Sequence, residues 1–221
     1  MRTFKTLVII ILLLSLQKIS SQLTDPFLYK YSIYKSYNPE KAKTYKDIDG
    51  SPYLNEEFVE AILYFKDTTS LKIPLRYNIY TECMEYQLNG INYVVTNPQT
   101  LNKILLGKSE FVYLPFILNG GYFELLELSK CTLVKKRKIN YKPSESKSYG
   151  GIVIPARFSS IPDIYYLVVN DSVAFKIIKL KSVKNALKDK KIEIENFIKT
   201  ENIKNVKKEN LIKIARYYNS L

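Results

Sequence analysis

One alternating stretch in the first half of the chain constrains the fold more than any other feature. Apolar and polar residues alternate over 71–80, and again on a shorter run over 84–88. A period of two is typical of a strand that buries one face. Asn89-Gly90 follows, then a third run over 91–95. Asn-Gly between alternating runs predicts a tight hairpin, because both central residues of a type I′ turn need a positive φ. We therefore predict an antiparallel β-meander at the centre of the protein.

Short apolar runs separated by turn residues continue this pattern up to about residue 178. We predict further strands over 58–65, 101–106, 110–116, 122–128, 131–139, 152–158, 164–169 and 172–178. These make about eleven strands at short spacing, with no βαβ crossover. The expected fold is mainly β with C-terminal helices (α+β), and its antiparallel meander forms a sandwich or an open barrel.

Two segments of this β-region stand out by their polarity. The strand over 131–139 ends in Lys135, Lys136, Arg137 and Lys138. Alternation would place charges on both faces there, so we expect this strand end to project beyond the core or to form a protected edge. The stretch 140–151 is the longest predicted loop, either a mobile binding loop or a plain surface connection.

The apolar period changes to a helical one near residue 180. Ile194, Phe197 and Ile198 recur at helical spacing, and Ser182 or Asp189 can cap a helix. A final helix over 209–218 carries one apolar stripe, made of Leu211, Ile214, Ala215 and Tyr218. We predict two to three short helices, with their stripes packed on the sheet or across a barrel mouth. A partner helix or an anionic membrane surface is the alternative.

The N-terminal residues have the pattern of a signal peptide. Arg2 and Lys5 precede an apolar run over 7–14, and small residues stand just before Gln22. The run is shorter than the roughly 20 residues of a membrane-spanning helix, which makes an uncleaved anchor the weaker alternative. The predicted organisation is a signal peptide (1–21), an irregular Tyr-rich arm (22–57), an antiparallel β-domain (58–179) and a basic helical segment (180–221) packed on it.

The positive charge is concentrated in the C-terminal segment. The formal net charge is +13, and residues 176–221 hold thirteen Lys and Arg against five Asp and Glu. Such a field can steer acidic partners, anionic lipid or nucleic acid. Abundant Lys, Asn, Ile and Tyr also fit the amino-acid usage of an AT-rich genome. For an exported protein we expect no nucleic-acid partner, and we keep peripheral membrane contact through the basic C-terminus as a possibility.

The inventory of reactive side chains excludes several enzyme classes. The chain has no histidine, which removes Ser-His-Asp and Cys-His arrangements and most zinc sites. Glycine-rich phosphate-binding motifs are also missing. We therefore expect no metal, no cofactor and no catalytic residue. A carboxylate-based hydrolase stays an alternative, although Glu82 and Glu85, like Glu124 and Glu127, are three residues apart and would point to opposite strand faces.

Four residues of the central meander are the candidate ligand-binding set: Arg76, Asn78, Tyr80 and Tyr86. Arg76 and Asn78 lie on the polar face of one strand, where they can bind a carboxylate. The alternative is that they pair with a cross-strand acid such as Glu85. Cys83 and Cys131 are a possible disulfide in an exported protein, or else two buried free thiols.

The chain resembles a group of exported proteins of about this length from Bacteroidetes-type bacteria. The resemblance is carried by GSPYLNEEF (50–58), LRYNIY (75–80), MEY (84–86), GYFELL (121–126) and ARYYNSL (215–221). It implies a β-rich envelope or secreted protein with no assigned activity, and it transfers no functional residues.

These observations lead to one functional expectation with two rivals. We expect a non-enzymatic envelope protein that binds an apolar ligand or a protein partner. The rivals are a structural or adaptor protein of the envelope and a hydrolase of envelope glycans. Because the chain ends in a helix without an appended β-sandwich sorting domain, we expect the periplasm rather than the extracellular space.

Overall fold

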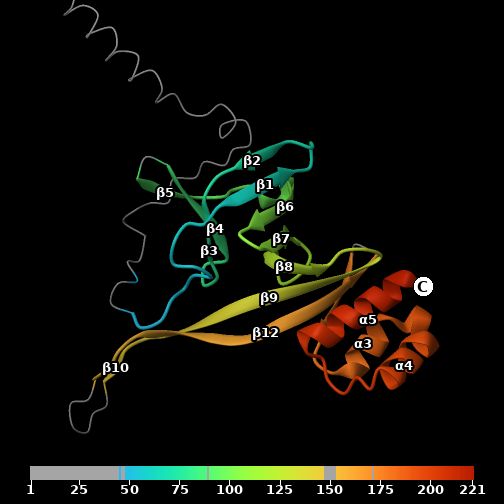
Figure 1. Ribbon diagram of the computed structural model, residues 1–221. Helices are drawn as coiled ribbons and strands as arrows, with labels where there is room; N and C mark the ends of the chain where they lie inside the picture. The colour runs from blue at the N-terminus through green and yellow to red at the C-terminus, as the bar shows by residue number, and fades with distance from the viewer. Residues whose placement is uncertain (1–44, 46–47, 89, 147–152, 171) are drawn as a thin grey trace, which may run out of the picture.

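The structure is a computed structural model that describes residues 45, 48–88, 90–146, 153–170 and 172–221. The predicted signal peptide and the Tyr-rich arm up to residue 44 lie outside the described residues. The fold is mainly antiparallel β with helices at the C-terminal end, as predicted, and its sheets are open rather than closed into a barrel. Figure 1 shows the long strands β9 and β12 running through the molecule, with the helices beside one end.

Two sheets hold most of the strands. The eight-stranded sheet has the order β13-β12-β9-β8-β7-β6-β1-β2, and the small sheet has the order β3-β4-β5. The strands of the large sheet are β1 (Ala61–Phe65), β2 (Ser70–Lys72), β6 (Leu101–Leu106), β7 (Ser109–Tyr113), β8 (Tyr122–Glu127), β9 (Cys131–Lys142), β12 (Arg157–Val169) and β13 (Val173–Ile177). The small sheet consists of β3 (Leu75–Asn78), β4 (Cys83–Leu88) and β5 (Ile91–Val94). A further short pair is formed by β10 (Glu145–Ser146) and β11 (Val153–Ile154), and η2 (Pro98–Thr100) precedes β6.

The small sheet packs on the large one and encloses the first core. This core joins side chains of both sheets: Ala61, Leu63 and Phe65 with Leu75, Tyr77, Met84, Tyr86, Ile104 and Phe111. The predicted hairpin is present, since Leu88 pairs with Ile91 across the turn. The run over 71–80 is not one strand, however. It breaks at Ile73-Pro74, so that β2 pairs with β1 in the large sheet and β3 pairs with β4 in the small one. Proline lacks the N–H that a continuous ladder needs.

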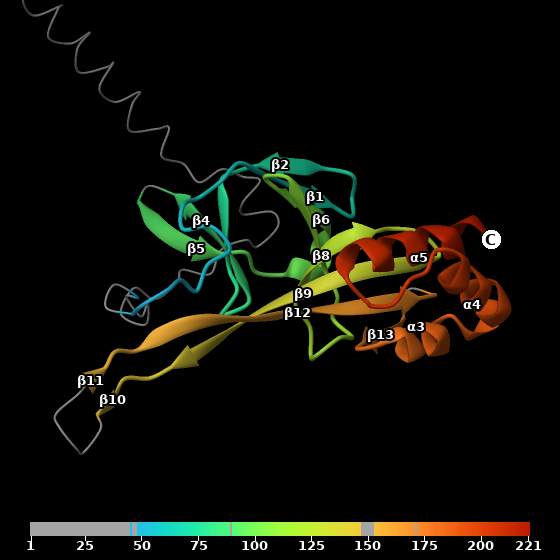
Figure 2. The same ribbon diagram turned by 60° about the horizontal axis from the view of Figure 1, so that its bottom comes forward.

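The strands β9 and β12 are longer than their sequence patterns indicate. β9 continues to Lys142, so the predicted loop is shorter. The strand expected over 152–158 divides into β11 and the start of β12, and β12 continues without a break to include the strand expected over 164–169. A register shift between Ile161 and Ile164 absorbs Pro162, which looked like a break in the sequence. In Figure 2 the two strands leave the sheet together as a two-stranded extension that points away from the helices. From here on "the arm" means this extension of β9 and β12 and not the Tyr-rich N-terminal segment.

Two of the three α-helices, the first and the last, pack against one face of β8, β9, β12 and β13, and the middle one packs on the other two. The three helices are α3 (Leu180–Ala186), α4 (Lys191–Thr200) and α5 (Lys208–Ser220), with η3 (Lys188–Lys190) between the first two. The predicted stripe of α5 is buried in a second core, which also contains Cys131, Leu133 and Leu167. None of the helices in the described part of the chain has the length and apolar character needed to cross a bilayer. Because the stripe of α5 is buried, its outer face offers a membrane little besides charge.

Asn219 near the end of α5 closes the second core onto the start of β9. Its side-chain amide accepts from the Cys131 N–H at 2.8 Å and donates to the Cys131 C=O at 3.0 Å, as a neighbouring strand would. We expect Asn219→Ala to lower the free energy of unfolding by about 1–2 kcal/mol, because both backbone groups lose their partner. Urea unfolding measures this effect. Asn196→Ala, at an exposed site on α4, serves as the control and should change stability by less than about 0.5 kcal/mol.

The possible disulfide is not formed. Cys83 and Cys131 are both free thiols. Cys83 begins β4 in the small sheet and its thiol donates to the Thr81 C=O at 3.3 Å, while Cys131 lies in the core beneath the helices. Burial raises the pKa of the Cys131 thiol to about 12, which keeps it protonated and unreactive. The strand pattern alone did not reveal that Cys83 lies at the start of the small sheet and Cys131 in the second core.

Lys135 and Lys136 correct another expectation, because both are buried in a central strand. On one face, Lys135 Nζ lies 2.8 Å from the carboxylate of Glu124, which also pairs with Arg137 at 2.9 Å. On the other face, Lys136 Nζ lies 2.9 Å from Glu82 and donates to the Tyr122 C=O at 3.1 Å. Burial lowers the pKa of the Lys136 amino group, and its bond to Glu82 partly offsets this. The charges of Lys135 and Lys136 are thus neutralised inside the fold and do not project from it.

Candidate functional site

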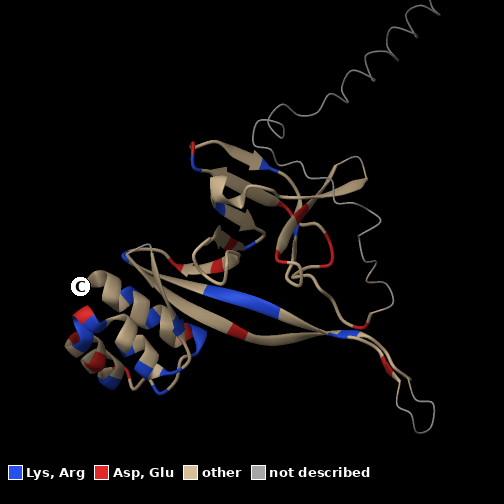
Figure 3. Ribbon diagram, turned by 180° about the vertical axis from the view of Figure 1, so that it is seen from behind, with Lys and Arg blue, Asp and Glu red and all other residues tan. Residues whose placement is uncertain are grey.

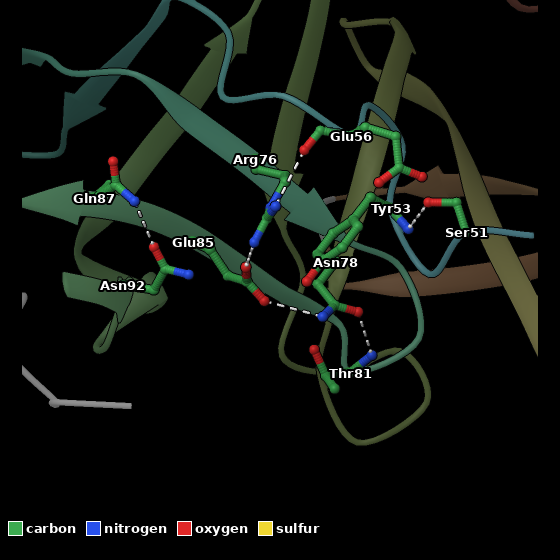
Figure 4. A network of polar contacts seen from close by, with 9 residues as sticks. All are labelled: Ser51, Tyr53, Glu56, Arg76, Asn78, Thr81, Glu85, Gln87 and Asn92. Atoms are coloured by element: carbon green, nitrogen blue, oxygen red, sulfur yellow. Dashed lines mark hydrogen bonds and ion pairs between the residues drawn. The ribbon is translucent and has the colours of Figure 1, made fainter. Parts of the chain in front are cut away.

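The polar residues predicted as a ligand site form a closed network inside the small sheet. Arg76 and Glu85 are cross-strand partners on β3 and β4, with Nη2 2.8 Å from Oε2. The other carboxylate oxygen of Glu85 accepts from Asn78 Nδ2 at 2.9 Å, and Asn78 Oδ1 accepts from the Thr81 N–H at 3.0 Å. Figure 4 shows these side chains turned toward one another. The alternative kept from the sequence, pairing with Glu85, is the arrangement observed.

This network holds the segment over residues 50–54 against the edge of β3. The guanidinium carbon of Arg76 lies 3.8 Å above the Tyr53 ring centre, and its Nη1 donates to the Glu56 C=O at 3.1 Å. Backbone bonds from Leu54 N to Tyr77 O (2.9 Å) and from Ile79 N to Pro52 O (2.8 Å) complete the attachment. The predicted residues therefore position a neighbouring segment, and a cation stacked on an aromatic ring adds about 1 kcal/mol to that attachment.

The same segment also crosses β12, where Gly50 is required. Phe158 N donates to Asp49 O at 2.7 Å, and a Cβ at position 50 would lie 2.7 Å from the Phe158 C=O. Gly50 also has φ +77°, a conformation that side chains disfavour. Tyr45 and Tyr80 pack on the Phe158 ring from other segments, with ring centres 5.3 and 5.2 Å away. The segment is thus held between the small sheet and the arm.

A cleft of about 370 Å³ lies where this segment, the end of β3 and the arm meet. Half of its twelve lining residues are apolar or aromatic: Tyr53, Leu54, Ile79, Ile139, Phe158 and Ile161. Gly50, Ser51, Arg137, Lys138, Ser160 and Asp163 complete it. Its volume lies in the range of small-molecule sites, which are mostly apolar with a few polar groups that orient the ligand.

The charged groups of the cleft differ in how they are engaged. Arg137 donates to Glu124 through Nε (3.2 Å) and Nη2 (2.9 Å), and Asp163 lies 3.5 Å from Lys135. Lys138 forms no ion pair with any of the described residues. Burial alone would raise the pKa of Glu124, but the hydrogen bond and charge of Lys135, together with Arg137, lower it. Glu124 therefore stays ionised and neutralises its cations, which leaves Lys138 as the cation available to a ligand.

The four candidate residues predicted from the sequence are not among the residues that line this cleft. Tyr80 packs on the Phe158 wall, whereas Tyr86 is fully buried in the first core and stacks on Tyr93. The lining residues themselves were missed. Only the Asp49-Gly50 turn signal marked their neighbourhood, because residues 50–54, 137–139 and 158–163 are far apart in sequence and meet only through the tertiary fold.

The carboxylates considered for hydrolysis are each bound to a cation. Glu82 pairs with Lys136, Glu85 with Arg76, and Glu127 with Arg216 at 2.8 Å. A glycoside hydrolase of the common type needs two carboxyl groups facing one cleft. Asp163 is the carboxylate that lines the cleft described above. In the described ranges no three His, Cys, Asp or Glu side chains are grouped to hold a metal ion.

Comparison of the chain with protein-family models, with curated proteins and with solved structures found no match. The geometry of the cleft and the N-terminal sequence are therefore the features that bear on function.

Proposed function

We propose that this is an exported, non-enzymatic binding protein of the cell envelope that takes an apolar ligand with an anionic end. The observation that carries the proposal is the cleft between residues 50–54 and the arm. Half of its lining residues are apolar or aromatic, and it includes Lys138, a cation with no ion-pair partner among the described residues. The signal-peptide pattern over residues 1–21 supports the compartment.

The chemistry of the lining selects the class of ligand. Apolar side chains favour a hydrocarbon or aromatic body, at about 25 cal/mol for each Å² removed from water. Lys138 favours a carboxylate, sulfonate or phosphate on the same molecule, since its charge has no partner among the described residues. Asp163 at the same cleft disfavours a second anionic group. The ligand class is therefore an apolar molecule with one acidic group.

Two fluorescent probes separate these contributions. ANS (anilinonaphthalene sulfonate) is apolar and anionic, and N-phenylnaphthylamine is a neutral relative. We expect Lys138→Ala to weaken ANS binding about fivefold, corresponding to roughly 1 kcal/mol for a partly exposed charge pair. Binding of the neutral probe should not change. Fluorescence titration of the folded mature protein measures both constants.

Two further variants make this test specific. Ile161→Glu puts a charge on the exposed edge of the cleft (side chain 40% accessible) and should weaken both probes. Lys142→Ala lies four residues farther along the same strand, outside the cleft lining, and should affect neither probe. Equal losses in Lys138→Ala and Lys142→Ala would reduce the effect to overall charge and contradict the proposal.

The natural occupant can be sought directly. The protein is isolated gently from its native envelope and examined by native mass spectrometry. A discrete adduct of small-molecule mass supports the proposal. A protein that arrives bare or together with another protein would favour the envelope adaptor instead.

A further inference from the structure

The outer part of the arm has no neighbouring strand from the large sheet. The ladder between β8 and β9 begins at Lys135, and that between β12 and β13 begins at Tyr165, so neither extends into the arm. Beyond these points the strand ladder of β9 and β12 is formed only with each other, down to Lys142 and Arg157, and the one further bridge to them among the described residues joins Asp49 to Arg157. A charged side chain on this outer part of the arm must be balanced by the arm itself, by nearby loops or by a partner.

Lys142 and Arg157 are direct cross-strand partners, and both are exposed. Like charges directly opposite one another on a sheet destabilise it by about 0.2–1 kcal/mol. Neither residue forms an ion pair with a described residue. Asp49 is joined to Arg157 by a backbone bridge, and Glu145 follows shortly after Lys142, yet no ion pair results.

The cations in the middle of β9 differ from this exposed pair, because each of them is paired with a carboxylate. Lys135, Lys136 and Arg137 each have a carboxylate within 2.9 Å. Figure 3 shows a blue stretch of Lys and Arg along the middle of β9, with red stretches of Asp and Glu on neighbouring elements. Among the described residues, the fold thus places a carboxylate beside Lys135, Lys136 and Arg137 and none beside the exposed pair on the arm.

The next pair on the same strand face is Asn140 and Ser159. Consecutive pairs on one face are about 7 Å apart along a strand, so the two cations are followed by an amide and a hydroxyl in line. None of these four residues is aromatic, and protein interfaces draw most of their affinity from aromatic and arginine anchors that sit in desolvated pockets. A narrow row of cations and neutral donors fits an extended anionic polymer better than a protein surface.

We propose that the arm face formed by Asn140, Lys142, Arg157 and Ser159 binds a linear polyanion that is not a polypeptide, with carboxylate or phosphate groups as the recognised chemistry. Arg157 offers paired donors to either group, and Lys142 adds a point charge beside it. This binding is independent of the cleft, because none of the four residues lines it. It also relieves the repulsion between the two cations.

The test uses polygalacturonate and polyphosphate as the carboxylate and phosphate probes, with poly-L-glutamate as the polypeptide. We expect the full mature protein to bind one or both of the first two at low salt and to bind poly-L-glutamate more weakly. Lys142→Gln/Arg157→Gln should weaken binding at least tenfold. It should also reduce the slope of log K against log salt concentration by roughly two, since two contacts are lost. The stronger of the first two probes identifies the anionic group.

A charge-matched control decides whether the site is local. Lys188→Gln/Lys191→Gln removes the same charge from exposed positions on the helical segment and should leave the affinity within twofold of the wild type. An equal loss in both double variants, tighter binding of poly-L-glutamate, or no polyanion binding at low salt would each overturn the proposal. Thermal unfolding verifies that both variants remain folded, as expected for exposed positions.

Discussion

Replacing Glu82 by alanine is expected to lower the free energy of unfolding by about 3 kcal/mol, because the fully buried Lys136 loses its carboxylate. The larger part of this loss comes from the uncompensated charge and not from the ion pair itself. Adding Lys136→Met to Glu82→Ala should therefore restore most of the stability, since methionine fills similar space without charge. Urea unfolding of the two single variants and the double variant measures the cycle.

The backbone conformation of residue 82 does not contribute to the stability difference between the wild type and Glu82→Ala. Glu82 has φ 56°, and an alanine there carries the same Cβ and the same strain. Glu60→Ala is the control, because Glu60 pairs with Lys72 at 3.0 Å on the surface and both side chains are mostly exposed. It should cost less than about 1 kcal/mol. If Lys136→Met failed to rescue Glu82→Ala, the buried charge would not be the source of the loss.

The same pair gives stability a dependence on pH. Burial lowers the pKa of Lys136 in the folded protein below the ordinary value of 10.5. Between these two values the unfolded chain holds the proton that the folded protein has released, so stability rises with pH. Below the folded-state pKa the penalty of burying the charge is constant. Wild type minus Lys136→Met should therefore gain stability as the pH approaches 10, and the subtraction removes the contributions of the buried tyrosines.

Glu85→Ala is expected to cost about 3–5 kcal/mol, because it leaves Arg76 without its buried carboxylate and the fully buried Asn78 amide without its acceptor. The loss should also loosen residues 50–54, which Arg76 holds through Tyr53 and Glu56. We therefore expect faster hydrogen exchange at the Leu54 amide, whose bond to Tyr77 O closes this attachment.

Binding and a matched variant separate the two effects of Glu85→Ala. Under conditions where the variant is still folded, its affinity for ANS should fall because one wall of the cleft has moved. Gln87→Ala removes an exposed bond to Asn92 (3.2 Å) on the same strand and should alter neither exchange nor binding. An unchanged Leu54 amide in folded Glu85→Ala would show that the network does not hold the wall.

Local sequence patterns predicted the fold class but not how deeply individual side chains are buried. The Asn89-Gly90 hairpin and the stripe of α5 depend on a few neighbouring residues, so they were predictable. Lys135 and Lys136 were expected at a projecting strand end. Their burial depends on Glu124, on Asp163 and on a turn more than fifty residues earlier in the chain, none of which strand alternation reveals.

The candidate site, like the fold, was predictable only where neighbouring strands determine it. The pairing of Arg76 with Glu85 could be inferred from the alternation, because it is set by the register of the adjacent strands β3 and β4. The cleft was not predicted, since it depends on how residues 50–54 cross β12 and on the shift at Ile161. Pro74 and Pro162 also misled the strand boundaries: one divides an alternating run, and the other is accommodated inside a strand.

The two hydrogen bonds between the Asn219 side chain and the Cys131 backbone have a consequence for how the chain folds during its synthesis. These two residues are 88 positions apart, and the helices that cover β9 follow every strand in the order of synthesis. A nascent chain that has produced all of its strands still exposes Cys131, Leu133 and Leu167 until α5 emerges. The second core can therefore close only after α5 is made, and a product interrupted before Lys208 would present an open apolar face to chaperones and proteases.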